Sequence, residues 1–170
     1  MTAFHFDVVS LPPSDHPTAG ETAPDFTRPL VTGEYWEDAT LSEVAADGPV
    51  LLAFLPMDGT GLTTHTCIDL RRRGWADDVT VVGYSISTPY EHLAFVRDHD
   101  LPFPLFSDPR AGVAERYDVT HDHGGMTGLV GARPAFFLLE ADLTVAYAWA
   151  ATEWPASRPY AAVERAIDAL

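Results

Sequence analysis

The chain has 170 residues and a formal net charge of −15, from 25 acidic residues against 10 basic ones. Apolar residues make up 46% of the chain, which predicts one packed domain rather than disorder. No apolar run approaches the roughly 20 residues that cross a bilayer, and the first ten residues lack the basic start of a secretory signal. We therefore expect a soluble, cytoplasmic protein.

All ten basic residues are arginines, and the chain has no Lys, Asn or Gln. The one basic cluster, Arg71-Arg72-Arg73, fits a helix C-terminus, where cations complement the helix dipole, so nucleic-acid binding is not predicted. An acidic surface repels itself at low ionic strength, and we interpret this composition as a halophilic-type surface suited to a salt-rich cytoplasm.

Cys67 is the only cysteine, so an intrachain disulfide, a CxxC redox pair and a thiolate zinc cluster are all excluded. His121-Asp122-His123 has two imidazoles on alternate residues, but no third ligand follows, and Gly124-Gly125 favours a solvated loop. No metal and no cofactor are predicted.

The first half of the chain opens with an arm containing five prolines between residues 12 and 29, which excludes a helix there. We place the arm at residues 1–21 and the domain at residues 22–170. Thr40-Leu-Ser-Glu43 has the pattern of a capping box and predicts a short helix. The apolar run Val50–Leu55 predicts a strand buried on both faces, and a helix from Thr63 to Arg73 should follow it.

In the second half, Val79–Ile86 is a second core strand, and Ser87-Thr88-Pro89 predicts a capped helix to about His99. The remaining expected elements are an extended piece at 103–106, a helix at 110–117, a glycine-containing loop at 121–133, a hairpin of 134–140 with 144–151, and a helix at 158–169. Crossover helices followed by a hairpin predict an α/β protein with a mixed central sheet and helices on both faces.

Several segments resemble the peroxiredoxins, the redoxin family of alkyl hydroperoxide reductase and thiol-specific antioxidant proteins. They are Ala23-Pro-Asp-Phe26, "VLLAFLP", "VTVVGYS", "FPLFSDP" and "RPAFFLLEADLTVAYAW". The similarity covers about residues 22–168. It implies a thioredoxin-like fold, an oxidoreductase that reduces hydroperoxides with an external thiol reductant, and a homodimer.

The family's active site is Pro-x-x-x-Thr-x-x-Cys at a helix N-terminus, together with an arginine from a later strand. The resemblance assigns Pro56, Thr60 and Arg133 to the proline, threonine and arginine, and Thr63 to the position of the peroxidatic cysteine. Because a hydroxyl ionises far less readily than a thiol, this pattern predicts weak or no peroxidase activity and a binding or structural role. A pocket holding Pro56, Thr60, Thr63 and Arg133 should favour a hydroperoxide or a small anion.

The alternative is a one-cysteine thiol peroxidase that uses Cys67 with Thr60 and Arg133. Thr64-His-Thr-Cys67 also reads Thr-x-x-Cys, but this register would leave only about 9 Å of helix before Gly74, at 1.5 Å per residue. In the direct register, Cys67 lies one turn beyond Thr63 on the same helix face. A small buried core residue is the favoured interpretation of Cys67, and a reactive thiol is the other.

Overall fold

The computed structural model describes residues 7–122 and 126–170. Its helices are α1 (Leu41–Val44), α2 (Gly61–Arg73), α3 (Pro89–Asp98), α4 (Gly112–Arg116) and α5 (Tyr160–Asp168), with short 3-10 turns η1 (Ala45–Asp47) and η2 (Trp75–Asp77). Its strands are β1 (Val9–Ser10), β2 (Thr27–Val31), β3 (Trp36–Thr40), β4 (Val50–Phe54), β5 (Thr80–Ser85), β6 (Leu105–Ser107), β7 (Thr120–Asp122), β8 (Val130–Ala132), β9 (Ala135–Leu139), β10 (Val145–Ala150) and β11 (Glu153–Trp154).

Within the described residues, the central sheet has seven strands in the order β10-β9-β4-β5-β6-β2-β3. β5 is parallel to β4 and to β6, whereas β9 is antiparallel to β4. The three apolar runs expected to form the core are thus adjacent strands, and every residue of β4 and β9 is buried. The predicted mixed sheet is confirmed.

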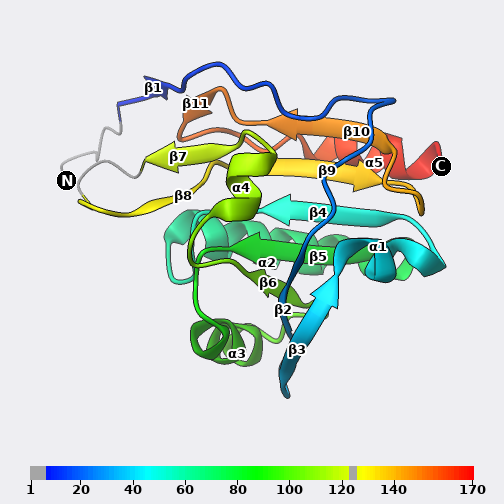
Figure 1. Ribbon diagram of the computed structural model, residues 1–170, viewed down its shortest axis with the longest axis horizontal. Helices are drawn as coiled ribbons and strands as arrows, with labels where there is room; N and C mark the ends of the chain where they lie inside the picture. The colour runs from blue at the N-terminus through cyan, green and yellow to red at the C-terminus, as the bar shows by residue number, and fades with distance from the viewer. Residues whose placement is uncertain (1–6, 123–125) are drawn as a thin grey trace.

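Alternate residues of β4 enter two different cores, as the two-residue repeat of a strand requires. Leu52 and Phe54 pack on the face covered by α1 and α4, and Leu51 and Ala53 pack on the face covered by α2, α3 and α5. Figure 1 shows α4 in front of the sheet and α2 behind it. Helices therefore cover both faces, as the sequence predicts.

Four local expectations need correction. The segment after the arm pairs as the β2–β3 hairpin, which was not expected, and part of the glycine-containing loop pairs as β7 and β8. The capping box at α1 does not form, because Thr40 makes no cap hydrogen bond and Asp25 accepts hydrogen bonds from Ser42 N (2.9 Å) and Ser42 Oγ (2.6 Å) instead. Helix α2 begins at Gly61, two residues before the expected start, since Thr60 is its N-cap.

Residues 9–21 lie across the upper edge of the molecule in Figure 1, where β1 pairs with β11. Further along the arm, the amide of Gly20 donates to the Val145 carbonyl at 2.9 Å, and the amide of Val145 donates to the Glu21 carbonyl at 2.8 Å. The described part of this segment is thus extended and packs against β10 and β11, and its separation from the domain at residue 22 stays a prediction.

Candidate functional site

The N-terminus of α2 is set by the hydroxyl of Thr60. Thr60 Oγ1 accepts a hydrogen bond from the Thr63 amide at 3.2 Å, which satisfies one of the free donors at the helix start. The same oxygen lies 2.9 Å from Thr63 Oγ1 and 3.1 Å from the Met57 carbonyl oxygen. Thr63 is fully buried and Pro56 is buried at the end of β4, so the structure brings these three predicted residues to one end of one strand.

Cys67 lies one turn further along α2, between the helix and the sheet. Its side chain is inaccessible to solvent and belongs to the core that also contains Leu51 and Phe136. Burial raises the pKa of the Cys67 thiol, and the negative charge of Asp58 raises it further. Both effects oppose formation of a thiolate, the species that attacks peroxides.

Arg133 follows β8 and is 5% exposed. Its Nη1 donates to the carbonyl oxygens of Pro12 (2.9 Å) and Ala151 (3.2 Å), and its Nε and Nη2 both reach the Thr120 carbonyl at 3.4 Å. Burial lowers the pKa of Arg133, and the nearby charge of Asp118 opposes that shift. Among the described residues, no hydrogen bond joins Arg133 to Thr60.

The cavities around these groups differ in their lining. Thr60 lines a hollow of about 470 Å³ with Leu62, His65, Trp154 and Arg158. Arg133 lines two others, of about 750 Å³ and about 330 Å³, and Trp154 also lines the larger one. The described contacts place Thr60 with Thr63 and leave the expected convergence with Arg133 a prediction. The arginine that lines the Thr60 hollow is Arg158, which the sequence analysis did not identify as a candidate site residue.

A buried hydrogen bond between Asp58 and His92 fixes the loop between β4 and α2. Asp58 Oδ2 lies 2.6 Å from His92 Nδ1, and the two side chains are 7% and 0% exposed. His92 Nε2 lies 3.0 Å from the Phe106 carbonyl oxygen, which only accepts, so this nitrogen carries a proton. The Asp58 amide also donates to Ser87 Oγ at 2.9 Å. The loop that precedes Thr60 is thereby tied to α3 and to the end of β5.

Sequence reasoning missed this pair. Asp58 and His92 are 34 positions apart, and no sequence motif connects them. The available signal was a histidine on the inner face of α3, where His92, Phe95 and Val96 are buried. A histidine at a core position of a helix needs polar partners, and that requirement could have prompted a search for an acidic one.

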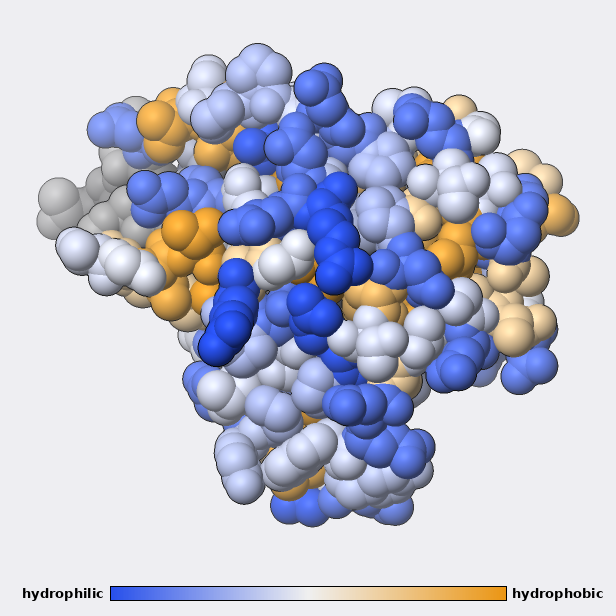
Figure 2. Space-filling view, in the orientation of Figure 1, coloured by the Kyte–Doolittle hydropathy of each residue, from blue (hydrophilic) through white to orange (hydrophobic). Residues whose placement is uncertain are grey.

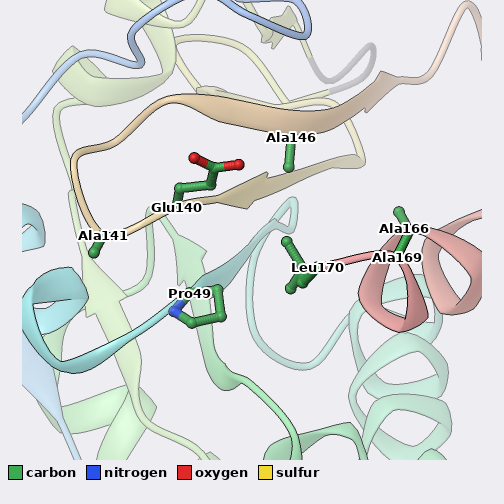
Figure 3. A pocket seen from close by; sticks show the side chains of 7 residues that line it. All are labelled: Pro49, Glu140, Ala141, Ala146, Ala166, Ala169 and Leu170. Carbon is green, nitrogen blue, oxygen red and sulfur yellow. The ribbon is translucent and has the colours of Figure 1, made fainter.

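Figure 3 shows a further hollow, of about 490 Å³, at the other end of β4. Its lining comes from the residue before β4, the β9–β10 turn, strand β10 and the C-terminal end of α5: Pro49, Glu140, Ala141, Ala146, Ala166, Ala169 and Leu170. Glu140 is the only ionisable side chain among these residues, and the rest are small or apolar. This hollow has no nucleophile and no side-chain cation.

The part of the chain that the structure describes contains no group of three or more His, Cys, Asp or Glu side chains placed to hold a metal ion. His121 lies on β7, whereas His123 of the same predicted pair is outside the described residues. No helix in the described ranges is long and apolar enough to span a membrane.

A thioredoxin-like α/β fold with a Pro-x-x-x-Thr loop leading into a helix is typical of the peroxiredoxins. The AhpC/TSA family model matches residues 19–148, and this chain belongs to that family. Peroxiredoxin Bcp of Bacillus subtilis is 34% identical over 104 residues, covering 59% of this chain and 63% of its own. The chloroplastic 2-Cys peroxiredoxin of Spinacia oleracea is 30% identical over 121 residues, covering 65% and 46%.

The solved structure of peroxidoxin BcpB from Mycobacterium tuberculosis superposes with a TM-score of 0.74 at 24% identity, covering 90% of this chain and 96% of that one. This likeness supports the fold. Across four curated relatives, the matches span 46% to 66% of the relatives' length. Activity, substrate and partners therefore have to be argued from the residues.

Proposed function

We propose that this protein is a redoxin-domain protein in which Thr63 occupies the position of the peroxidatic cysteine, with weak or no thiol peroxidase activity and a binding or structural role. The observation that carries the proposal is the position of Thr63 in the first turn of α2, three residues after the Thr60 N-cap. A helix N-terminus stabilises a thiolate there. A threonine hydroxyl stays protonated in the same field and does not attack peroxide.

The burial of Cys67 argues against the alternative of a one-cysteine peroxidase. Attack would require a thiolate sulfur to displace alkoxide or hydroxide from the peroxide and become a sulfenic acid. Thr63 and Cys67 are equally inaccessible to solvent, but Cys67 lies among apolar side chains and its pKa is raised by burial and by Asp58. The helix dipole also weakens beyond the first turn, so Cys67 receives less of its field than position 63 does.

The test compares peroxide consumption, with dithiothreitol as reductant, by the wild-type protein and by Thr63→Cys, Thr63→Ser and Cys67→Ser variants. We expect the wild type, Thr63→Ser and Cys67→Ser to stay near the uncatalysed rate. Thr63→Cys should consume peroxide at least about tenfold faster, because it places a thiol where the helix dipole acts. Thr63→Ser is the matched control, since it changes the same side chain without supplying sulfur.

Two results would contradict the proposal. Rapid wild-type turnover that disappears in Cys67→Ser would identify Cys67 as the nucleophile and establish the one-cysteine peroxidase. A folded Thr63→Cys variant whose thiol reacts no faster than that of a denatured control would show that position 63 does not activate a nucleophile.

We further propose that a small anion or a hydroperoxide binds near Arg133. We also propose that the protein is a homodimer in the cytoplasm. Any active variant would use an external thiol as its reductant. The single cysteine supports the last point, since one thiol cannot resolve its own sulfenic acid as an intrachain disulfide. Sedimentation velocity tests the dimer, which a monomer at micromolar concentration would contradict.

A further inference from the structure

Residues 11–13 cover Arg133, the one buried arginine among the described residues. Pro12 presents its carbonyl oxygen to Arg133 Nη1 at 2.9 Å. The two cavities that Arg133 lines lie under the same piece of chain, since Leu11, Pro12 and Pro13 line both of them. Moving this segment would join the two hollows and expose the guanidinium.

Hydrogen bonds supply most of the contacts that hold this segment in the described part of the chain. Residues 9–16 are attached by the two-residue pairing of β1 with β11, the Leu11 amide bonded to the Thr152 carbonyl at 2.9 Å, and bonds from Ser14 and Asp15 to Asp118. The Pro12 carbonyl also accepts from Arg133, and the His16 ring packs edge-on against Phe137. Val9 is 58% exposed, and Pro12 and Pro13 are exposed. Figure 2 shows hydrophobic residues on the surface where Figure 1 draws β1, β7 and β8. A surface segment held mainly by a few hydrogen bonds can open locally while the core stays folded.

The chain after this segment is held firmly. Gly20 and Glu21 exchange backbone hydrogen bonds with Val145, and Ala23 and Phe26 are 3% and 4% exposed in the core. Pro17 and Gly20 (φ +91°) lie between the loose and the firm parts. Glycine adopts this backbone conformation without strain, so the chain can change direction there.

We propose that residues 9–16 form a hinged strap that opens about the 17–20 segment and controls the access of solutes to Arg133. In the closed strap, the Pro12 carbonyl oxygen accepts a hydrogen bond from Arg133 Nη1. In the open strap, the carbonyls of Ala151 and Thr120 still hold the guanidinium in place, because neither belongs to the arm. The inference does not depend on what Thr63 or Cys67 does.

A reversible tether tests the strap. The Leu11–Thr152 hydrogen bond and the β1–β11 register make Ser10 and Glu153 the neighbouring non-hydrogen-bonded pair. Cα atoms of such pairs are about 4.5 Å apart, which suits a disulfide. The Ser10→Cys/Glu153→Cys variant can therefore be locked by oxidation and released by reduction, while Cys67 stays buried.

The readout is labelling of arginines by phenylglyoxal, mapped by peptide mass spectrometry, with the exposed Arg110 as the internal reference. We expect Arg133 in the reduced variant to label at the wild-type rate and in the oxidised variant at least about tenfold more slowly, with Arg110 unchanged. Equal Arg133 rates in the oxidised and reduced states would overturn the strap.

A second measurement needs no variant: in wild-type hydrogen exchange, the Leu11 amide should exchange at least 100-fold faster than the amides of β9. Equal protection of Leu11 and β9 would also overturn it.

Discussion

Thr63 and Cys67 lie one turn apart on the same face of α2, and neither side chain is accessible to solvent. Their surroundings differ. Thr63 is hydrogen-bonded at the helix start, whereas Cys67 is packed among apolar side chains with Asp58 as the nearby charge. The nearby carboxylate is itself held by His92. At the scale of single residues, the site is therefore built to keep its polar groups paired and its thiol protonated.

This protonation has a consequence for stability at alkaline pH. The pKa values of Cys67, Tyr84 and Tyr117 are all raised, chiefly by burial. In the unfolded chain the thiol ionises near pH 8.5 and the tyrosines near pH 10, so above these values the unfolded state releases protons that the native state keeps. We therefore expect the free energy of unfolding to fall as pH rises above about 8.5, by up to about 1.4 kcal/mol per pH unit for each such group.

Urea denaturation between pH 7 and 10.5 measures this fall. Cys67→Ala should flatten it from about pH 8.5, and Tyr117→Phe should flatten it only near and above pH 10. The slopes are compared rather than the absolute stabilities, because each substitution also removes core contacts. A Cys67→Ala slope identical to wild type between pH 8.5 and 9.5 would contradict the assignment.

At the scale of elements, two segments carry the same capping-box pattern and only one of them forms it. At α3, Thr88 accepts from the Glu91 amide at 3.4 Å, and Glu91 Oε1 accepts from the Thr88 amide at 2.9 Å. Thr40 instead ends β3, and its hydroxyl lies 2.8 Å from Thr27 Oγ1 across the hairpin. The strand pairing positions Thr40, so its side chain is not available to the helix.

The cap that forms at α3 predicts a measurable cost for its removal. Thr88→Ala should lower the free energy of unfolding by about 1 kcal/mol, the usual loss for a helix N-cap. Thr88→Ser should restore most of it, because serine keeps the accepting oxygen. Chemical denaturation of the three proteins at pH 7 provides the measurement, and a Thr88→Ser variant as unstable as Thr88→Ala would show that the methyl group, not the cap, is responsible.

At the scale of the whole molecule, the net charge of −15 acts against the compact state. Most of the face in Figure 2 is hydrophilic, and exposed carboxylates can be screened by salt, whereas the buried Asp58–His92 pair is screened much less. Self-repulsion should therefore depend on ionic strength while the site stays intact.

We accordingly expect the thermal midpoint to rise from dilute buffer to molar KCl, because screening relieves repulsion among the acidic side chains. Thermal melts followed by circular dichroism in 20 mM buffer with and without 1 M KCl measure the shift. Repeating the melt at equal ionic strength with sodium sulfate separates screening from salt-specific effects. A midpoint that is unchanged or lower in KCl would count against the halophilic interpretation.

Local patterns were sufficient for the core strands and for the ends of α3. The runs that became β4, β5 and β9 are apolar over strand length, and the Thr88-Pro89 cap depends on four consecutive residues, so the causes lie within the segments themselves. The Pro56 and Thr60 spacing likewise located the loop before α2. Short strands such as β2 and β7 were missed, because their extended conformation depends on pairing with β3 and β8 rather than on a pattern within each segment.

The sequence by itself determined the α/β class, the acidic net charge, the single thiol and the threonine at position 63. Only the tertiary structure decided which groups meet. The contact of Asp58 with His92 joins residues 34 positions apart, and that of Pro12 with Arg133 joins residues 121 positions apart. Such contacts follow from strand order and from the path of the arm, and no periodicity within either segment encodes them. The burial that keeps Cys67 protonated is likewise a property of the assembled core, since a thiol acquires its pKa from its surroundings.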